Sequence, residues 1–521
     1  MNNKKYILIF LCLFLAACSN VTVPEIHEKE EARQTPELSP SSDTDITGDG
    51  TLRMSMLSPN TLNPLLNTDE SVDAVLRLMF EPLYMLDNNL TPVPNLAESS
   101  TASRDGKAVS VKVKEGAKWW DGESITADDI VYSVEVLKSA PADSIYKSCG
   151  ENMLYATKDS EYIATIYFSS PVGCPENRLC FPLIPKHHYS KGNVNMYPIG
   201  NGFYKFSNYT YMREMNLEAC PCFKGEASIK NINISILTNK QAVKNAFESG
   251  ITDIIDLPPS ESTKTAKSDD CIAAYNTNNF LFLAFNLRQA RFSDESIRTA
   301  LARLIPTEDI VRNVYVDRAV KSITPINPAN SLVDKALVQN YDYDKNMAQT
   351  ILFAEGRSGE ELKFEILVNN EDQSKCAVAD RIGDAFKDAG IPVTVKKTDY
   401  ATYTELLKKG EFDAYIGEVR LRDDYNLFAL LHSSSVTSGI NYSGFKDVYM
   451  DKLISQCNTA KDKQTYTQAL NELNKYCSIK LPIIGICFPC NCLTFSPGIK
   501  SEKNPSLNNI YANINNWTIE R

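Results

Sequence analysis

Apolar residues recur at helical spacing in three stretches of the chain. In ADDIVYSVEVLKSA, residues 127–140, they lie three and four positions apart, and Thr126 with Asp129 gives the capping pattern of a helix start. SDESIRTALARLI, residues 293–305, has the same spacing and is followed by a proline, after which PTEDIVRNVY, residues 306–315, begins again. We predict a helix in each stretch.

Strand and helix patterns then alternate between residues 361 and 419. We predict strands in ELKFEILVN, IPVTVKK and FDAYIGEV, and helices between them in CAVADRIGDAFKDAG and YTELLKKG. This alternation predicts a mostly parallel sheet with helices on both faces. Upstream, YNTNNFLFLAFN, residues 275–286, is strand-like and could join two lobes.

The chain opens with a charged and then an apolar segment. Lys4 and Lys5 precede an apolar run that ends in LAAC, residues 15–18, and polar residues follow. This layout is typical of a secretory signal, and the run is shorter than the roughly 20 residues that span a membrane. LAAC resembles the bacterial lipobox, which implies a signal peptide of residues 1–17 and an acylated Cys18. The alternative is an ordinary signal peptide with an incidental cysteine.

The segment after the leader has the composition of a linker. Residues 18–48 are rich in acids, proline and serine and contain no aromatic residue. Such a segment cannot bury enough apolar surface to offset its ordering entropy, so we predict a disordered tether from the acylated cysteine. The remaining roughly 470 residues exceed one ordinary core and predict two or three lobes.

The amino-acid composition and the net charge are those of an acidic globular protein. The chain is 43% hydrophobic and 23% charged, with a formal net charge of -11. An acidic surface argues against nucleic acid as a partner. No apolar run beyond the leader approaches membrane-spanning length. We therefore expect a globular body that binds no nucleic acid.

Fourteen cysteines are present, and all but Cys12 and Cys18 lie in the body that follows the predicted tether. Disulfides persist outside the cytoplasm, and the short loop CPENRLC makes Cys174 with Cys180 the pairing that we predict. CFPCNC, residues 487–492, and the CPC at 220–222 could supply two halves of a zinc site. The first lies in an apolar, strand-like stretch where cysteine acts as a small hydrophobe, so we predict no metal.

The sequence contains no catalytic constellation that we can identify. G-x-S-x-G, P-loop, G-x-G-x-x-G and H-E-x-x-H motifs are absent, and only four histidines exist. His187 and His188 are adjacent and do not face each other on a helix. His432 follows an apolar helical pattern and is expected at a helix cap or core edge. We predict no catalytic residue and no cofactor, with an extracellular hydrolase as the alternative.

Five motifs, in order along the chain, resemble family 5 extracellular solute-binding proteins, the peptide- and nickel-type receptors of bacterial ABC importers. Their signature is a Trp, an acidic or polar residue, a Gly, a spacer and Thr-Ala-x-Asp-Val before a helix. Here Trp120, Asp121, Gly122 and residues 126–130 occupy those positions. The five stretches are SPNTLNPLLNTDESVDAVLRLMFEPLYMLD, GAKWWDGESITADDIVYSVEVL, PIGNGFYKF, FLAFNLRQARFSDESIRTALARLIPTEDIVRNVY and YDYDKNMAQTILFAEG.

The resemblance implies an architecture. It is an α/β, two-lobed periplasmic-binding-protein fold with an extra lobe, mixed sheets flanked by helices, and a hinge between lobes. The two crossings between lobes I and III, near Tyr275 and near Cys490, would form the hinge. The implied lobes are residues 49–68, 195–274 and 490–521 for lobe I, 69–194 for lobe II and 275–489 for lobe III.

The resemblance also implies a function. The protein would be the substrate-binding lipoprotein of an ABC transporter, capturing a peptide or peptide-like solute between its lobes and delivering it to a membrane permease. Its partners would be permease and ATPase subunits, and the membrane through the lipid anchor. We expect a monomer on the outer face of the cell membrane, or in the periplasmic space if the host has two membranes. The alternatives are a nickel or metal-chelate receptor of the same family and an extracellular signalling binder.

Peptide receptors of the family hold the ligand amine with an Asp in a Gly-Trp-x-x-Asp stretch. The equivalent here, YIGEVRLRDDYNLFALL, has no Trp. The resemblance places Arg420 at the Asp position, where a guanidinium would suit a carboxylate, and other gaps place Glu418 or Asp423 there. Glu418 and Arg420 lie two apart near a strand end, so both side chains can point into the cleft. We interpret Arg422 and Asp424 as a solvated turn.

Trp119 and Trp120 are further candidates for the ligand site. Side chains of adjacent residues in an extended segment point to opposite faces. This predicts that one indole is buried in a lobe and that the other lies near the cleft.

Overall fold

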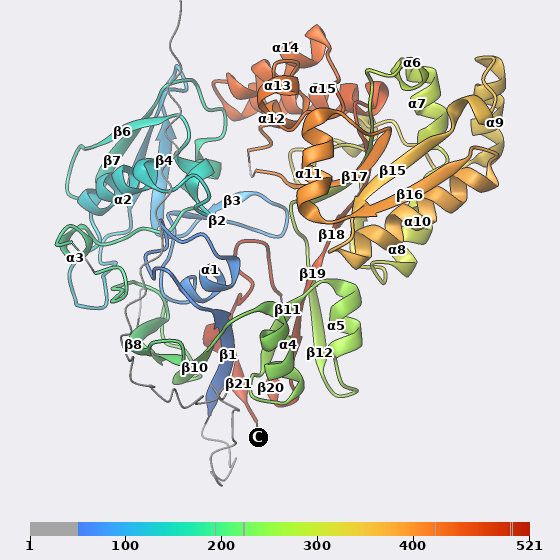
Figure 1. Cartoon of the computed structure of the whole chain (residues 1–521). Coiled ribbons are helices and arrows are strands. Elements are labelled where there is room, and N and C mark those ends of the chain that lie inside the picture. Colours follow the sequence, from blue (N-terminus) through green and yellow to red (C-terminus); the bar gives the residue numbers. More distant parts are fainter. Residues whose placement is uncertain are drawn as a thin grey trace, which may run out of the picture. The chain divides into compact units, whose positions relative to one another are not determined.

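The computed structural model shows a mixed α/β protein (Figure 1). The predicted signal peptide, the predicted tether and Cys18 lie outside the described residues, as does Asp423. Among the described helices, none is long and apolar enough to cross a membrane. The ranges that the structure describes are 50–192, 194–221, 224–422, 424–500, 502 and 504–520.

One sheet is built only from strands of the first half of the chain, and a second sheet combines two strands from the middle of the chain with one strand from its C-terminal part. The first contains, in spatial order, β1 (Thr51–Leu57), β10 (Asn231–Leu237), β9 (Glu214–Ala219) and β8 (Tyr204–Thr210). The second contains β11 (Ile254–Leu257), β19 (Asn491–Phe495) and β12 (Cys271–Tyr275). Because β19 pairs with both of its neighbours, the C-terminal part of the chain is tied to the middle.

A third sheet packs against the helix predicted over residues 127–140. That helix is α2 (Ala127–Ser139), and its capping box is formed: the Asp128 N–H donates to the Thr126 hydroxyl, and the Thr126 N–H donates to Asp129. Its apolar face is buried, so this prediction is confirmed. The sheet contains β4 (Ala97–Ala102), β5 (Ala108–Val113), β7 (Ile163–Phe168) and β6 (Met153–Lys158), all antiparallel.

The largest sheet has six strands. In spatial order they are β14 (Ala319–Lys321), β18 (Ile484–Pro489), β13 (Asn279–Phe285), β17 (Ala414–Arg420), β15 (Phe364–Asn369) and β16 (Val393–Thr398). The three strands predicted between residues 361 and 419 are β15, β16 and β17, and β15 is parallel to both others. The prediction of a mostly parallel sheet is wrong, because β13, β14 and β18 pair antiparallel. These three come from segments outside the strand–helix–strand alternation, which alone requires parallel pairing.

Helices cover both faces of this sheet, as the alternation predicts. Side chains alternate along a strand, so Leu281 and Leu283 of β13 enter one core while Phe280 and Phe282 enter the other. The predicted helices at 293–305 and 306–315 are α7 and α8. The first core is covered by α7 (Glu295–Ala302), α8 (Thr307–Asn313), α9 (Lys345–Ala354) and α10 (Gln373–Asp388), and the second by α11 (Tyr400–Lys409), α14 (Val448–Asn458) and α15 (Lys463–Lys480).

Two short segments carry the chain between the three-stranded and the six-stranded sheet. β12 ends at Tyr275 and β13 begins at Asn279, so the strand predicted over residues 275–286 is interrupted. On the return, β18 ends at Pro489 and β19 follows almost at once. The Thr277 hydroxyl donates to the Pro489 carbonyl at 2.6 Å, so the two crossings lie side by side. The lobe boundaries and the hinge stay predictions.

Shorter elements connect the sheets. Of these, α1 (Glu70–Leu76) borders the cleft described below, and its first N–H groups donate to the Asp69 carboxylate. The others are β2 (Tyr84–Leu86), β3 (Pro92–Pro94), α3 (Lys186–Tyr189), α4 (Lys240–Glu248), α5 (Pro259–Thr265), α6 (Ala290–Ser293), α12 (Phe428–Leu431), α13 (Ser435–Ser438), β20 (Ile499–Lys500) and β21 (Thr518–Ile519).

The predicted disulfide is not formed, because Cys174 is a free thiol. Cys174 and Cys180 flank a short 3-10 turn; Cys174 packs against an apolar core, and the Cys180 thiol donates to the Glu176 carbonyl at 3.6 Å. Burial raises the pKa of Cys174 to about 12. The cysteines of CFPCNC are buried among apolar residues. Across the described ranges, no group of three or more His, Cys, Asp or Glu side chains could hold a metal ion.

Candidate ligand-binding cleft

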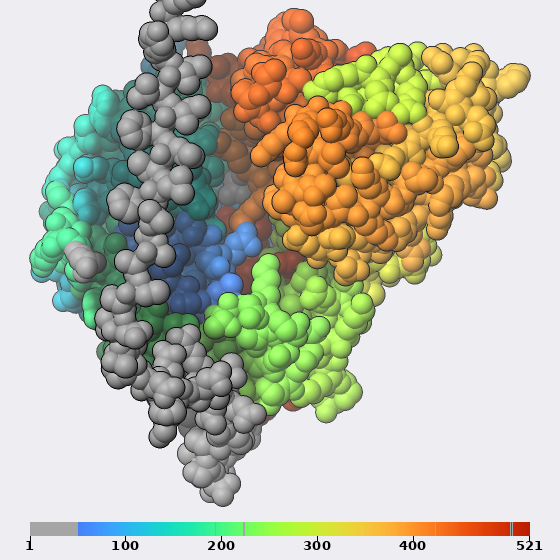
Figure 2. All heavy atoms as spheres, viewed as in Figure 1, coloured from blue at the N-terminus to red at the C-terminus, as the bar shows by residue number. Residues whose placement is uncertain are grey.

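Two adjoining cavities border α1 and the three-stranded sheet; the larger one is also lined by β1 and α4, and the smaller one reaches the six-stranded sheet at Asn279 and Arg420. Their volumes are about 580 Å³ and about 90 Å³, and pockets for small ligands measure about 300 to 1,000 Å³. In Figure 2 the surface is hollowed between the blue atoms of the N-terminal part and the orange atoms of the large sheet and its helices. We name the two cavities together the cleft, because both are lined by Glu70, Ala74, Asp256, Asn491 and Ile510.

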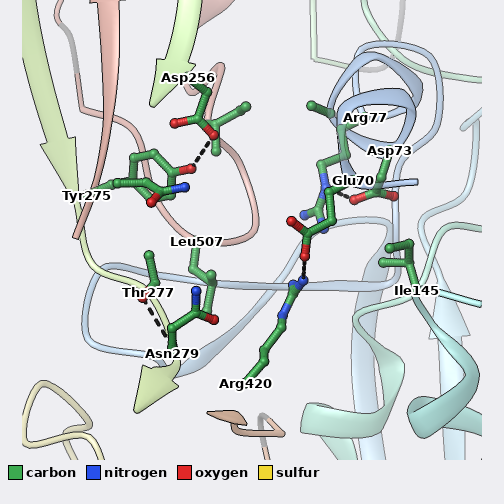
Figure 3. Close-up of a pocket in the computed structure, with 13 residues that line it drawn as sticks. Glu70, Asp73, Arg77, Ile145, Asp256, Tyr275, Thr277, Asn279, Arg420 and Leu507 are labelled. Atoms are coloured by element: carbon green, nitrogen blue, oxygen red, sulfur yellow. Dashed lines mark hydrogen bonds and ion pairs between the residues drawn. The ribbon is translucent and has the colours of Figure 1, made fainter. Parts of the chain in front are cut away.

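The smaller cavity receives Arg420 from the C-terminal end of β17 (Figure 3). Its guanidinium pairs with the carboxylate of Glu70, the first residue of α1. The two side chains are 47% and 74% exposed. An exposed ion pair contributes little, typically less than about 1 kcal/mol, so a ligand carboxylate can compete with Glu70 for this guanidinium.

Asp256 lies across the smaller cavity from Arg420, beside Tyr275 (Figure 3). The Tyr275 hydroxyl donates to Asp256 Oδ2 at 2.7 Å. Arg77, which also lines the smaller cavity, pairs with Asp73 of the same helix, because its Nε donates to that carboxylate at 2.8 Å. The cleft therefore presents an acidic group on one side and a basic group on the other.

Glu418 has a different neighbourhood from Arg420, although both lie on β17. Its carboxylate pairs with Lys375 of α10 at 3.1 Å, and Lys375 also pairs with Asp372 at 3.1 Å. Burial lowers the pKa of Lys375, but the two carboxylates outweigh burial and raise it above its ordinary value. Glu418 does not line either cavity of the cleft. The structure brings Arg420 to the cleft and leaves Glu418 in a local ion-pair cluster.

The two tryptophans belong to the core that α2 and the four-stranded sheets share in the N-terminal part of the chain, and not to the cleft. Trp119 is 2% exposed, and its indole N–H donates to Asp129 at 3.3 Å. Trp120 is half-buried, and its indole N–H donates to the Gly202 carbonyl at 3.2 Å. Gly202 itself has no room for a side chain, because a Cβ there would lie 2.4 Å from the Leu78 carbonyl oxygen. Neither indole lines the two cavities.

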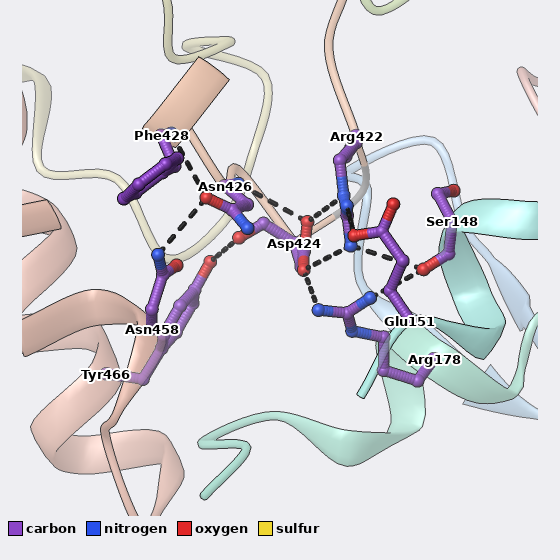
Figure 4. Close-up of polar contacts among 9 residues, drawn as sticks. All are labelled: Ser148, Glu151, Arg178, Arg422, Asp424, Asn426, Phe428, Asn458 and Tyr466. Atoms are coloured by element: carbon purple, nitrogen blue, oxygen red, sulfur yellow. Dashed lines mark hydrogen bonds and ion pairs between the residues drawn. The ribbon is translucent and has the colours of Figure 1, made fainter. Parts of the chain in front are cut away.

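Arg422 and Asp424 are not a solvated turn, and that interpretation is wrong. Arg422 pairs with Asp424 at 3.0 Å and also with Glu151, while Asp424 pairs with Arg178 (Figure 4). The side chains of Arg178 and Asp424 are only 7% and 16% exposed. The Ser148 carbonyl accepts from Arg178 at 2.6 Å and from Arg422 at 3.2 Å.

This ion network joins two parts of the chain that are far apart in sequence. Glu151 and Arg178 belong to predicted lobe II, whereas Arg422 and Asp424 follow β17 in predicted lobe III. Burial opposes ionisation of the Asp424 carboxyl, but Arg178 and Arg422 outweigh burial and hold its pKa below the ordinary value. Asp424 is therefore an ionised carboxylate that connects predicted lobe III with predicted lobe II through Arg178.

The three described histidines make local contacts outside the cleft. His187 pairs with Asp121 at 2.6 Å, and His188 contacts the Tyr197 carbonyl at 2.7 Å. His432 caps the C-terminal end of α12, as predicted. None of the three lines the cleft.

Several cleft residues were missed by sequence reasoning. Glu70, Asp256, Tyr275 and Asn491 come from the start of one helix and from strands of one sheet that are widely separated along the chain. Glu70 lies within the first of the five family-like stretches, and Tyr275 and Asn491 lie at the two predicted crossings, but nothing in those patterns marks any of the four as a ligand-site residue. A polar side chain at the edge of an apolar stretch is too frequent to single them out.

Sheets joined by two crossing segments, with a cleft bordered by both, define the class of two-lobed solute-binding proteins. The chain belongs to the bacterial extracellular solute-binding proteins, family 5, because residues 91–438 match the middle part of that family. It is a family of binding proteins, not of enzymes. The predicted family and fold class are confirmed.

Known proteins of similar sequence and structure agree with this assignment. The oligopeptide-binding protein AppA of Bacillus subtilis (strain 168) is 22% identical over 544 residues, which cover 99% of this chain and 98% of that protein. The ABC transporter substrate-binding protein CtaP from Listeria monocytogenes has a TM-score of 0.78 at 20% identity, covering 90% of this chain and 99% of its own. NikZ from Campylobacter jejuni, in complex with Ni(L-His), has a TM-score of 0.70 at 20% identity and the same coverage.

Proposed function

We propose that this protein captures a peptide or peptide-like solute in the cleft and delivers it to the permease of an ABC importer. The observation that carries the proposal is the cleft itself: its larger cavity measures about 580 Å³, and its smaller cavity has opposite charges on its two sides, at Asp256 and Arg420. A peptide carries both an ammonium and a carboxylate, so such a cleft matches its charges. The near full-length similarity to an oligopeptide-binding protein supports the same reading.

We further propose that the protein acts as a monomer with three lobes, bounded as the sequence predicts, and that Cys18 anchors it on the outer face of the cell membrane. The lipobox-like LAAC supports the anchor. Acyl chains hold an otherwise soluble protein at a membrane when more than one chain is attached. A permease and an ATPase would complete the transporter.

A metal-chelate receptor is the second candidate, because NikZ with bound Ni(L-His) has a similar fold. Mass spectrometry of small molecules that co-purify with the natively expressed protein separates the two. We expect peptides. Recovery of nickel with a histidine-like chelator, and of no peptide, would favour the second candidate.

Arg420→Ala is expected to weaken peptide binding by roughly 1.5–3 kcal/mol, because it removes a charged hydrogen-bond donor from the cleft. Titration calorimetry with the co-purified peptide measures the loss. Arg312→Ala, an exposed arginine of α8 outside the cleft, is the matched control and should leave affinity unchanged. A loss of less than about twofold, roughly 0.4 kcal/mol, would remove Arg420 from the ligand site.

A further inference from the structure

Two acidic residues, Glu70 and Asp256, line both cavities of the cleft. Glu70 pairs with Arg420, whereas Asp256 forms no ion pair among the described residues. It is a residue of β11, is exposed toward the cleft, and accepts its hydrogen bond from the Tyr275 hydroxyl at 2.7 Å. Within the described residues, no Lys, Arg or His nitrogen lies within 4.0 Å of its carboxylate. A carboxylate that faces a cavity without a basic partner is free to pair with a ligand cation.

The basic groups around the cleft do not neutralise Asp256. Arg77 pairs with Asp73, and Arg420 pairs with Glu70. Lys240 and Lys244 of α4 line the larger cavity but form no ion pair with Asp256. The ionisable groups that interact with Asp256 are Tyr275 of β12, Glu70 of α1, Cys492 of β19 and Tyr511, and none of them is a cation.

The surroundings also disfavour the free carboxylate. Although Asp256 is exposed toward the cleft, partial desolvation by the surrounding protein raises its pKa to about 7; Glu70 adds to the rise, whereas hydrogen bonds from Tyr275 and Asn491 oppose it. A nearby positive charge would stabilise the ionised form. A cation bound in the cleft would therefore lower the pKa of Asp256 and stabilise its ionised carboxylate.

We propose that Asp256 binds a cationic group of the ligand, an ammonium or a guanidinium, and so selects for peptides that carry one at this end of the cleft. The inference deepens the proposed function and rests on it. Arg420 on the opposite side of the smaller cavity would face the anionic part of the same ligand (Figure 3). The cation can be the amino terminus of a peptide or a basic side chain, since the two present the same charge.

This assignment predicts how affinity depends on pH. A cation pairs with the ionised carboxylate, so affinity rises as Asp256 loses its proton. With a pKa of about 7, the ionised fraction increases about sixteenfold between pH 5.5 and pH 7. A ligand amine remains protonated across that interval, so the change reports on Asp256.

The test uses an equimolar pool of pentapeptides, randomised at every position, and the same pool with acetylated amino termini. The wild-type protein is expected to retain peptides from the free pool, which mass spectrometry identifies, and the most enriched one is synthesised for calorimetry. Asp256→Asn, which keeps the shape of the side chain, should weaken that peptide about tenfold or more and abolish the rise in affinity between pH 5.5 and 7. Asp269→Asn, an exposed aspartate just after α5, is the matched control and should change neither.

The acetylated pool identifies the source of the cation. If acetylation removes the difference between wild type and Asp256→Asn, the partner is the amino terminus; if replacement of a Lys by norleucine removes it, the partner is a side chain. Tyr275→Phe provides a second variant with the carboxylate intact, and it should shift the pH profile upward because a donor to the ionised form is lost.

Each contrary result has a distinct meaning. Should Asp256→Asn and Tyr275→Phe bind the selected peptide with wild-type affinity and pH profile, Asp256 does not contact a cation, while peptide capture stands. Should the wild type retain no peptide from either pool, the proposed function fails and this inference fails with it.

Discussion

Asp424→Ala is expected to lower the free energy of unfolding by about 3 kcal/mol, because breaking a buried ion pair leaves an uncompensated charge. The charge left behind is that of Arg178, whose side chain is 7% exposed. Arg422 would lose its 3.0 Å partner as well, although it keeps Glu151. Urea unfolding followed by circular dichroism measures the change.

Asp424→Ala should also weaken the contact between the chain that follows β17 and two segments of predicted lobe II. Residues 148–151 and 175–179 are joined to the chain after β17 through this network (Figure 4). Hydrogen exchange in those two segments should speed up in Asp424→Ala, while exchange in the core strand β13 changes only through global stability. Asp380→Asn is the matched control: its pair with Lys397 is about half exposed, and its loss should change stability by less than about 1 kcal/mol.

The pH dependence of the same difference follows from the lowered pKa of Asp424. A carboxyl whose pKa is lower in the folded than in the unfolded state stabilises the fold above the unfolded value, which is about 3.9. That contribution is lost as pH falls through the lowered folded pKa. The stability gap between wild type and Asp424→Ala should thus be full at pH 6 and shrink in acid. A gap that stays constant down to pH 2.5 would show that Asp424 is not held by its arginines.

The sequence was sufficient to predict those helices and strands whose local pattern agrees with their environment in the fold. The capping box of α2 and the apolar face behind it are readable within fourteen residues, and the structure forms both. The alternation between residues 361 and 419 likewise fixes three parallel strands. The sheet as a whole was not predictable, because the direction of β13 and β18 depends on crossings near Thr277 and Pro489 that no local pattern encodes.

The cleft was harder to predict for the same physical reason. Arg420 was proposed because the resemblance placed it at the position of the amine-binding Asp, but its pairing with Glu70, 350 positions away in the chain, could not be read from either stretch. Asp424 was misinterpreted, since an Arg-x-Asp turn is usually solvated and only the folded chain reveals that Arg178 covers it. Contacts between distant segments decide which charged residues are exposed and which are paired.

The largest effect is expected at the N-terminus. Cys18→Ala should either release the protein from the membrane or leave an unprocessed precursor without acyl groups, because the proposed lipid is attached through this thiol. Cell fractionation with immunoblotting measures the distribution, and mass spectrometry of the mature amino terminus detects the acyl groups. Cys12→Ala, a cysteine inside the apolar run of the same leader, is the matched control and should leave the distribution and the acylation as they are. Membrane-bound, acylated Cys18→Ala protein would disprove the lipobox interpretation. A wild-type protein that begins at another residue, without acyl groups, would instead support an ordinary signal peptide with an incidental cysteine.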